Sequence, residues 1–426
     1  MKNYLLYIAI AFTLVNCQQK EDVANLEKPT NQIVIGQIDS VYSNILDESR
    51  NIWVHIPESA KNSTSNNIKY PVLYLLDGPG HFYSVTGMIK QLSTTNGNTI
   101  VPEMIIVAIP NTDRSRDLTP SHVDFDFFSG DSIQYSSGGG NKFLDFMEDE
   151  LIPHIEKTYP VSSYRTFVGH SFGGLSVINA LISRQHLFNN YVAIDPSLWW
   201  DNQAFLKVAD SILSVNKFDG KALYVGVANT MDEGMIIKEV RNDTTKSTAH
   251  IRSILQFVNS IDTQNDNGLL FGWKYYNDDD HGSVPLITEY DAFRFLFAWY
   301  TVVGINRFFD PNSNTSAEGL IDLLSSHYKN VSDRFGYQVL PPEQFINSMG
   351  YGFMNNSMLD KASALFDLNI QNYPKSSNVY DSRGDCFLAQ QDSIKALEYF
   401  TKALEVGSND FSQEKIDMLK EKLLEE

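Results

Sequence analysis

The sequence predicts an α/β fold: a mainly parallel β-sheet with helices on both faces, followed by a smaller all-α region. Two observations lead to this class. Several short segments, such as 71–78, run apolar almost without a break until a turn, which is typical of strands buried on both faces of a sheet. These segments alternate with stretches in which apolar residues recur at helical spacing, as expected when helices connect parallel strands.

The alternating segments occupy about residues 33–305, which we expect to form one α/β domain. Two paired strands are predicted within 33–58. The buried strands that follow are predicted at 71–78, 104–111, 165–170, 191–196, 222–229 and 272–278. Helices are predicted at 139–159, 173–183 and 246–259.

Composition narrows the range of functions. The 426 residues are 42% hydrophobic, which is enough for one large core and a small second one, and the net charge is −19. An acidic surface repels phosphate groups, which argues against nucleic acid as a partner. The sequence has no His-Glu-x-x-His, no closely spaced cysteine pair and no P-loop, so we expect no metal and no cofactor.

The N-terminal residues are typical of an export signal. Residues 1–16 combine a lysine with an apolar run of signal-peptide length, and Cys17 follows. "LVNC" resembles the lipobox of bacterial lipoproteins, and "QQKED" resembles the surface-export signal of Bacteroidota lipoproteins, with a polar tether as the alternative interpretation of "QQKED". We therefore expect 17–32 to be a lipid anchor and linker, and the protein to be an outer-membrane lipoprotein, either surface-exposed or facing the periplasm.

The segment 315–426 is predicted to be a helical region with an internal repeat. An offset of 34 between 346–379 and 380–413 aligns three pairs of identical residues: Gly350 with Gly384, Ala362 with Ala396 and Phe366 with Phe400. This pattern resembles the tetratricopeptide repeat, which usually needs three or more copies. We therefore favour a structural cap over a groove for a protein partner.

Ser171 is the candidate nucleophile. Residues 169–173 fit Gly-x-Ser-x-Gly, after a predicted strand and before a predicted helix. In that context the serine lies on a strained turn, and the flanking glycines let two backbones pass closely. The alternative is a strand–helix turn of a dinucleotide-binding fold, which would need Gly-x-Gly-x-x-Gly, and that motif is absent from the sequence.

A nucleophilic serine needs a base and an acid that orients the base, in the chain order serine, acid, histidine. His281 begins "HGSVP" after a strand-like run, so we assign it as general base, with His250 in a predicted helix as the minor alternative. Glu233 and Asp232 follow a strand end where such an acid belongs, and they rank equally. Asp195, one strand earlier, is the second choice.

Acyl transfer also needs two backbone N–H groups that bind the oxyanion. Phe172, directly after the candidate nucleophile, supplies one of them. The other should come from the loop after 71–78, through Gly78 or Gly80, because Pro79 has no N–H.

Five motifs together resemble the serine esterase family of α/β-hydrolases, which includes enterochelin esterases and esterase D-like enzymes. They are "YLLDGPGHF", "IPNTDRSRDLTPSH", "GHSFGG", "PSLWW" and "DDDHGSVP". The resemblance covers about 33–305 and implies an α/β-hydrolase fold and ester hydrolysis through an acyl-enzyme. It also implies substrate contacts from an arginine loop and an aromatic loop. The candidates in those loops are Arg114, Arg116, Trp199 and Trp200.

The leading interpretation is a membrane-anchored serine hydrolase that cleaves a siderophore trilactone or other small acyl esters. The first alternative is a carbohydrate esterase that removes acetyl or feruloyl groups from surface polysaccharide. A third hypothesis belongs to another class: a non-catalytic surface adaptor that binds a partner through its repeats. It is disfavoured because both the serine and the histidine are present.

Overall fold

The computed structural model describes residues 32–62, 68–263, 266–408 and 410–425. The predicted signal peptide 1–16, Cys17 and the linker up to residue 31 lie outside these residues. From Ile35 onward, the chain forms one compact unit. None of the helices in the described ranges is both long enough and apolar enough to cross a membrane.

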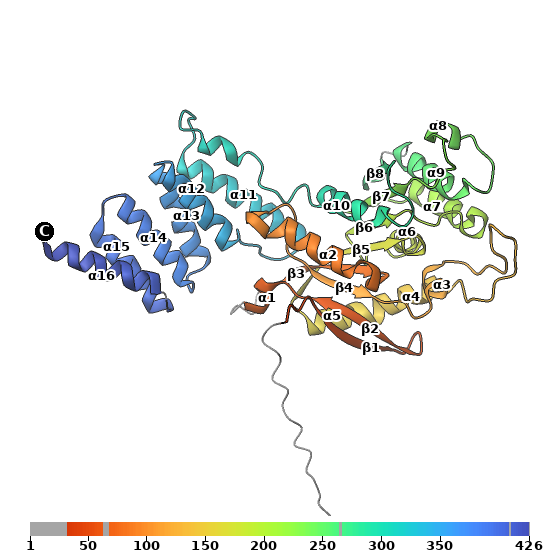
Figure 1. Cartoon of the computed structure of the whole chain (residues 1–426), viewed down its shortest axis with the longest axis horizontal. Helices are drawn as coiled ribbons and strands as arrows, with labels where there is room; N and C mark the ends of the chain where they lie inside the picture. The colour runs from red at the N-terminus through yellow and green to blue at the C-terminus, as the bar shows by residue number, and fades with distance from the viewer. Residues whose placement is uncertain (1–31, 63–67, 264–265, 409, 426) are drawn as a thin grey trace, which may run out of the picture. The chain divides into compact units, whose positions relative to one another are not determined.

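An eight-stranded sheet forms the centre of the described α/β region, with the spatial order β1-β2-β4-β3-β5-β6-β7-β8 (Figure 1). The strands β1, β2 and β4 pair antiparallel, and the other neighbours are parallel. This confirms the predicted mainly parallel sheet. In chain order the strands are β1 Gln37–Ser43, β2 Glu48–His55, β3 Tyr70–Leu76, β4 Ile105–Ile109, β5 Val161–His170, β6 Asn190–Ile194, β7 Ala222–Ala228 and β8 Leu270–Tyr276.

Ten α-helices accompany the sheet in the described ranges before residue 300. They are α1 Glu58–Asn62, α2 Gly78–Ser93, α3 Arg114–Leu118, α4 Gly140–Phe146, α5 Ile152–Thr158, α6 Phe172–Ser183, α7 Ala204–Val215, α8 Ile237–Val240, α9 Ala249–Thr263 and α10 Val284–Leu296. Alternate strand residues face opposite sides of the sheet. In β3, Tyr74 and Leu76 pack in one core with α4 to α7 and α9, whereas Leu73 and Leu75 pack in a second core with α2 and α10. Both faces of the sheet are therefore covered, as predicted.

Two helical segments differ from the prediction. The stretch 139–159 forms α4, a wider π-helical segment Met147–Leu151 and then α5. Pro153 lies in the first turn of α5 and has no N–H to donate to the preceding turn, so the helical hydrogen bonds have to change there. Residues 78–81, predicted as a loop, form the first turn of α2. A helix tolerates Pro79 there because the first N–H groups have no helical acceptor.

The C-terminal part of the described chain is helical, as predicted. Its helices are α11 Ala317–Phe335, α12 Glu343–Asn355, α13 Leu359–Asn372, α14 Ser377–Ala389, α15 Ser393–Val406 and α16 Asp410–Glu425. A Cβ on Gly350 would lie 2.6 Å from the Phe366 ring, and one on Gly384 would lie 2.5 Å from the Phe400 ring. Two successive helix pairs thus make the same close contact, 34 residues apart. Their assignment as tetratricopeptide repeats stays a prediction.

Helix α11 packs against the α/β region. Val331 and Phe335 are buried in the same core as α2 and α10. The Phe335 ring lies 5.0 Å, between centroids, from the ring of Tyr164 in β5. The sheet and the first C-terminal helix therefore share a hydrophobic core, while the predicted boundary between 33–305 and 315–426 stays a prediction.

Candidate active site

Ser171 lies in the turn that joins β5 to α6. Its backbone angles are φ 59° and ψ −115°, a strained conformation for a residue other than glycine. A Cβ on Gly169 would lie only 2.4 Å from the carbonyl oxygen of Gly173, so that position needs glycine. The turn therefore has the local geometry that exposes a nucleophilic serine between a strand and a helix.

Two helix N-termini meet at this turn. Helix α6 begins at Phe172 and α2 begins at Gly78, and the first N–H groups of a helix have no acceptor within it. The Asp77 carboxylate would lie 3.3 Å from a Cβ on Gly173, which brings the two helix starts together. The Gly80 N–H donates to the Asp77 carbonyl at 2.9 Å. Of the two glycines that the sequence left open, the geometry therefore favours Gly78 as the second oxyanion donor.

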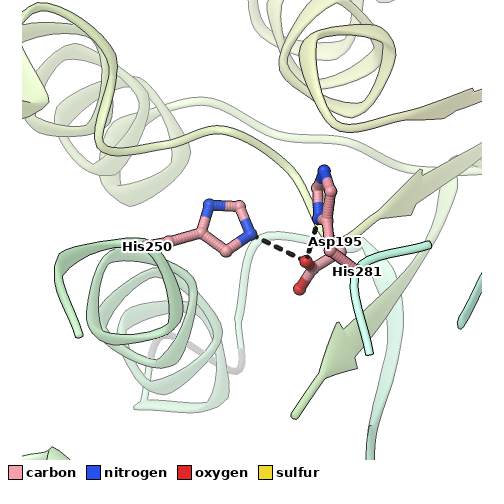
Figure 2. Close-up of side chains that lie close together, drawn as sticks. All are labelled: Asp195, His250 and His281. Atoms are coloured by element: carbon pink, nitrogen blue, oxygen red, sulfur yellow. Dashed lines mark hydrogen bonds and ion pairs between the residues drawn. The ribbon is translucent and has the colours of Figure 1, made fainter. Parts of the chain in front are cut away.

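Asp195 follows β6 and is fully buried, with φ 41°. Its Oδ1 accepts the Ala228 N–H at 2.9 Å, and its Oδ2 lies 2.6 Å from His281 Nδ1 and 2.7 Å from His250 Nε2 (Figure 2). Burial alone would raise the pKa of Asp195, but the charge of His250 and these three hydrogen bonds outweigh burial and hold that pKa below its usual range. A carboxylate only accepts, so each imidazole nitrogen that contacts it must carry a proton.

His281 lies in the turn between β8 and α10, and 42% of its side chain is exposed. The Asp280 carboxylate shapes this turn by accepting two backbone N–H groups at 2.9 Å. The His281 ring lies 4.4 Å, between centroids, from the ring of His170, which immediately precedes Ser171. With its Nδ1 proton directed to Asp195, His281 has Nε2 available as a proton acceptor beside the candidate nucleophile.

The Ser171 hydroxyl shares a hydrogen bond of 3.1 Å with Ser197 Oγ. Ser197 is 2% exposed, and its N–H donates to the Ser171 carbonyl at 3.1 Å. In this structure the Ser171 hydroxyl is therefore bonded to Ser197 and not to His281, and catalytic hydrogen bonds often tighten only when substrate binds. Sequence reasoning gave Ser197 no role, although it lies within "PSLWW".

Asp232 and Glu233, which sequence reasoning ranked first as the acid, are exposed in the loop after β7. Asp232 accepts a hydrogen bond from Ser247 Oγ at 2.9 Å, whereas His281 is bonded to Asp195. The acid next to His281 therefore follows β6 and not β7, because β6 ends one strand nearer to the Ser171 turn. This geometry favours the second choice over the first.

A family model described as "Putative esterase" matches residues 43–267, which is more than half of the chain. The chain belongs to this esterase family. It is 28% identical to the ferri-bacillibactin esterase BesA of Bacillus subtilis over 190 residues, 42% of this chain and 66% of that one. It is 32% identical to the siderophore enterobactin esterase of Emericella nidulans over 154 residues, 33% of this chain and 51% of that one.

The chain thus spans between about half and two thirds of the length of these curated relatives, 51% and 66%. Among solved structures, an IroE-like serine hydrolase from Shewanella oneidensis is 31% identical with a TM-score of 0.65. That likeness covers 79% of this chain and 99% of the other. The esterase family that the five motifs resembled is therefore confirmed.

In this esterase-family chain, Arg114 joins α2 to the Ser171 turn. Its Nε and Nη2 donate to the Asp77 carboxylate at 2.7 and 2.9 Å, and Nη2 also donates to the His170 carbonyl at 3.1 Å. Burial alone would raise the pKa of Asp77, but Arg114 and Asn111 outweigh it and lower that pKa. The Arg114 side chain remains 32% exposed, so it can both hold α2 and reach a substrate.

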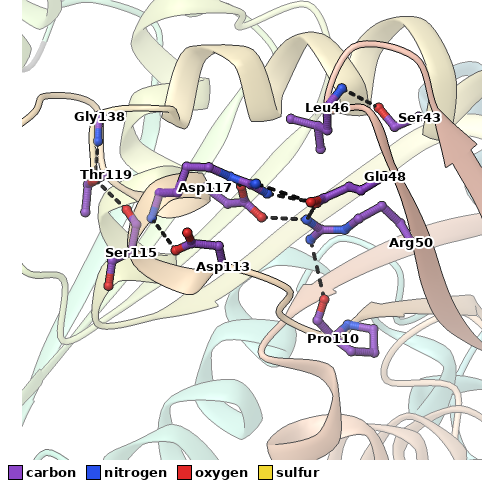
Figure 3. A network of polar contacts seen from close by, with 11 residues as sticks. Ser43, Leu46, Glu48, Arg50, Pro110, Asp113, Ser115, Asp117, Thr119 and Gly138 are labelled. Atoms are coloured by element: carbon purple, nitrogen blue, oxygen red, sulfur yellow. Dashed lines mark hydrogen bonds and ion pairs between the residues drawn. The ribbon is translucent and has the colours of Figure 1, made fainter. Parts of the chain in front are cut away.

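Arg116, the other predicted arginine, belongs to an ion-pair network, and Figure 3 labels Glu48, Arg50 and Asp117 of this network. Its guanidinium lies 2.8 Å from Glu48 and 2.7 Å from Asp117. The buried Arg50 pairs with the same two carboxylates at 2.7 and 2.6 Å. These contacts tie β2 to α3, which favours a structural role for Arg116 over substrate binding.

The two predicted tryptophans have different surroundings. Trp200 is 2% exposed, and its Nε1 donates to the Ser121 carbonyl at 3.1 Å, so it is part of the core. Trp199 is half-buried, with ring centroids 6.2 Å from Phe172 and 4.8 Å from the exposed Phe128. Of the two, Trp199 is therefore the one available to a substrate.

Three further titratable side chains that sequence reasoning did not single out surround the site. Burial and then the charge of His281 lower the pKa of His170 to about 4, so His170 is neutral near pH 7. His81 Nδ1 lies 2.8 Å from Oε1 of Glu289, which is fully buried in α10. Burial raises the pKa of Glu289, and Glu289 in turn raises the pKa of His81 against the effect of burial. These residues come from separate elements, so no sequence spacing indicates that they meet.

The residues at this site also resemble a metal-binding set. Asp195, His250 and His281 offer three ligand atoms within 4.8 Å of one another, a combination that transition metals favour. Their nitrogen–oxygen distances of 2.6 and 2.7 Å are hydrogen-bond lengths. Two ligands of one tetrahedral zinc, each about 2.0–2.1 Å from the ion, would lie about 3.3 Å apart. The observed geometry therefore fits two shared protons better than an ion.

Proposed function

We propose that this chain is a serine hydrolase that cleaves carboxylic esters through an acyl-enzyme intermediate. The observation that carries the proposal is a strained serine turn beside a histidine whose Nδ1 is bonded to a buried carboxylate at 2.6 Å. Family membership and the two helix N-termini at Phe172 and Gly78 support the same conclusion.

In the proposed reaction, Ser171 Oγ attacks the ester carbonyl carbon while its proton moves to His281 Nε2. The carbonyl oxygen becomes an oxyanion, which the N–H groups of Phe172 and Gly78 bind. Asp195 holds the tautomer of His281 and stabilises its cation. The tetrahedral intermediate then expels the alcohol, which takes the proton from His281. Water, deprotonated by His281, attacks the acyl-enzyme and releases the acid and the Ser171 hydroxyl.

For the substrate, we propose a siderophore trilactone or another small acyl ester. The curated relatives are named as esterases of ferri-bacillibactin and of the siderophore enterobactin, which supports this class. Arg114 and Trp199 are the side chains that we expect to contact it. An acetylated or feruloylated polysaccharide is the alternative substrate, for a carbohydrate esterase.

The test is hydrolysis by the full-length chain of a short nitrophenyl ester, a catecholate trilactone and acylated xylan. We expect Ser171→Ala to abolish every activity that the wild type shows. Ser176→Ala is the matched control, because Ser176 is a buried serine in α6 whose hydroxyl has no hydrogen-bond partner among the described residues. Trilactone cleavage without xylan deacylation would support the siderophore substrate, the reverse would support the polysaccharide, and activity that survives Ser171→Ala would overturn the proposal.

We also propose that the protein is anchored to the outer membrane by a lipid on Cys17, as a surface-exposed or periplasm-facing lipoprotein. The support is the lipobox-like "LVNC" after an apolar run of signal-peptide length. Cys17→Ser would remove the acylation site, so the protein should leave the membrane fraction. Unchanged pelleting of the Cys17→Ser variant with membranes would contradict this proposal.

For the helical region, we propose a structural cap whose removal lowers the stability of the protein. A groove for a protein partner is the alternative. The buried Val331 and Phe335 support the cap, because they complete a core shared with the sheet. The equivalent glycine–phenylalanine contacts of α12 to α15 support a repeat of the tetratricopeptide kind.

A further inference from the structure

His250 shares the carboxylate of the proposed catalytic acid with His281. Both imidazoles contact the same oxygen, Asp195 Oδ2, at 2.7 and 2.6 Å, and their ring centroids are 5.1 Å apart in a nearly perpendicular arrangement (Figure 2). His250 is the second residue of α9, and only 12% of its side chain is exposed. A serine, histidine and aspartate would suffice for the proposed reaction, so this second histidine needs an explanation.

We propose that His250 is a positioning residue, which fixes the Asp195 carboxylate for His281 and competes with His281 for its negative charge. This inference rests on the proposed ester hydrolysis at Ser171. His250 itself does not touch the substrate in this account, because its Nε2 is bonded to Asp195 and His281 is the ring next to the nucleophile turn.

The first argument is the orientation of the carboxylate. Asp195 receives one N–H from Ala228 at the end of β7, one from His281 in the turn after β8 and one from His250 in α9. Three donors from three separate elements leave the carboxylate a single orientation. Without His250, Oδ2 would keep a single donor in a fully buried environment, and the carboxylate could turn away from His281.

The second argument is charge. The groups that face His281 are Asp195 after β6, His250 in α9, His170 in β5 and Asp280 in its own turn. Of these, only His250 donates to the oxygen that His281 uses. An N–H on Oδ2 withdraws part of the negative charge that Asp195 would otherwise present to His281. Removal of that N–H should therefore strengthen the attraction between Asp195 and the cation that forms on His281 during the reaction.

Two further titratable residues near His170, His81 and Asp77, do not replace His250 as a partner of Asp195. The His81 ring lies 6.2 Å from the His170 ring, and its Nδ1 contacts Glu289. Asp77 is paired with Arg114. Neither His81 nor Asp77 contacts the Asp195 carboxylate through a hydrogen bond found in the described residues.

His250 is also an unsuitable candidate for the base itself. Its Nε2 is the atom bonded to Asp195, so this nitrogen carries its proton toward the carboxylate and not toward the nucleophile (Figure 2). His281 is the ring next to His170 and hence to the Ser171 turn. His250, the minor alternative for the general base, is therefore proposed as a positioning residue in the same site.

The test measures kcat/KM against pH for the full-length wild type, His250→Leu and His250→Gln on the same ester. Leucine fills similar space but donates no hydrogen bond, and glutamine donates an N–H without a charge. We expect His250→Leu to lower kcat/KM about tenfold or more, because it removes a hydrogen bond to a charged group. We also expect its acid limb to move up by about half a pH unit or more. His250→Gln should recover most of the rate.

The matched control is His186→Leu, because His186 is an exposed histidine that also contacts a carboxylate, Glu148, at 2.7 Å. It should leave both the rate and the pH profile unchanged. A wild-type rate and profile in His250→Leu would overturn the inference. An equal loss of kcat/KM in both His250 variants, with an unmoved acid limb, would also overturn the inference, because that result would indicate that His250 acts through packing alone. A folded wild type with no Ser171-dependent hydrolysis would instead overturn the proposed function and this inference with it.

Discussion

Replacing Asp195 with asparagine tests the acid of the site, and it does so against the acids that the sequence favoured. Asp195→Asn keeps the shape of the side chain but removes its charge. The carboxylate accepts three N–H groups, one at Oδ1 and two at Oδ2. An asparagine has one acceptor oxygen and an NH2 group, so its NH2 must face either the Ala228 N–H or the two imidazoles. In the first arrangement the Ala228 N–H loses its acceptor, and in the second the NH2 group cannot accept the His281 Nδ1 proton, which disfavours the tautomer that leaves Nε2 free.

The magnitude follows from the position of the charge. Asp195 is fully buried and 2.6 Å from His281, so water does not compensate for its loss when the imidazole becomes cationic. The corresponding substitution in a serine protease lowers kcat about 10⁴-fold. We expect a loss of about 10³–10⁴-fold here, which corresponds to about 4–5.5 kcal/mol of transition-state stabilisation.

The assay is the rate of ester hydrolysis by Asp195→Asn, with circular dichroism to verify that the variant is folded. Asp232→Asn and Glu233→Gln are the controls, because both residues are exposed in the loop after β7. The rate of each control should stay within about threefold of the wild-type rate, because substitutions of exposed residues usually change stability very little. A nearly active Asp195→Asn, or a 100-fold loss in either control, would refute the assignment of Asp195.

Three further predictions concern the surroundings of the site. Arg114→Met should lower kcat about tenfold or more, because it breaks the two hydrogen bonds to Asp77 that hold α2 against the nucleophile turn. Lysine cannot form this paired contact, so a full rate in Arg114→Lys would contradict the prediction. His170 in the unfolded chain takes up a proton near pH 6.5, whereas in the folded chain it does so only near its pKa of about 4, so the free energy of unfolding falls as the pH drops from 6.5 toward 4. Urea unfolding at pH 7 and pH 5 measures this fall. The fall should be about 2 kcal/mol smaller in His170→Asn than in the wild type. Phe335→Ala should lower the free energy of unfolding, measured by urea denaturation, by about 3–5 kcal/mol, because the Phe335 ring is 2% exposed and fills the core between α11 and the sheet. An unchanged free energy of unfolding would refute the proposed cap.

Much of the fold follows from local patterns in the sequence. The buried strands are apolar on both faces, so their residues indicate burial without any knowledge of their neighbours. Residues 169–173 carry their own signal, because a serine between two close glycines after a strand constrains the backbone locally. His281 could be chosen because "HGSVP" follows a strand and begins a turn.

The acid and its second histidine could not be chosen in this way. Asp195 and Asp232 both follow buried strands, and only the packing of three elements decides which carboxylate meets His281. Nothing in the sequence around Asp195 indicates that its φ is positive. His250 has the sequence pattern of any polar residue in an amphipathic helix. The N-terminus of α2 was also missed, because a Gly-Pro-Gly sequence normally predicts a loop and not the first turn of a helix.

The measurement that tests the central claim most directly is covalent labelling with a fluorophosphonate, which reacts with activated serines. The full-length wild type, Ser171→Ala and Ser176→Ala would be labelled, digested and analysed by mass spectrometry. The account predicts one adduct, on the peptide that contains Ser171, which is retained in Ser176→Ala and absent from Ser171→Ala. A folded wild type that takes up no label, or an adduct that persists in Ser171→Ala, would contradict the assignment of Ser171 as the nucleophile.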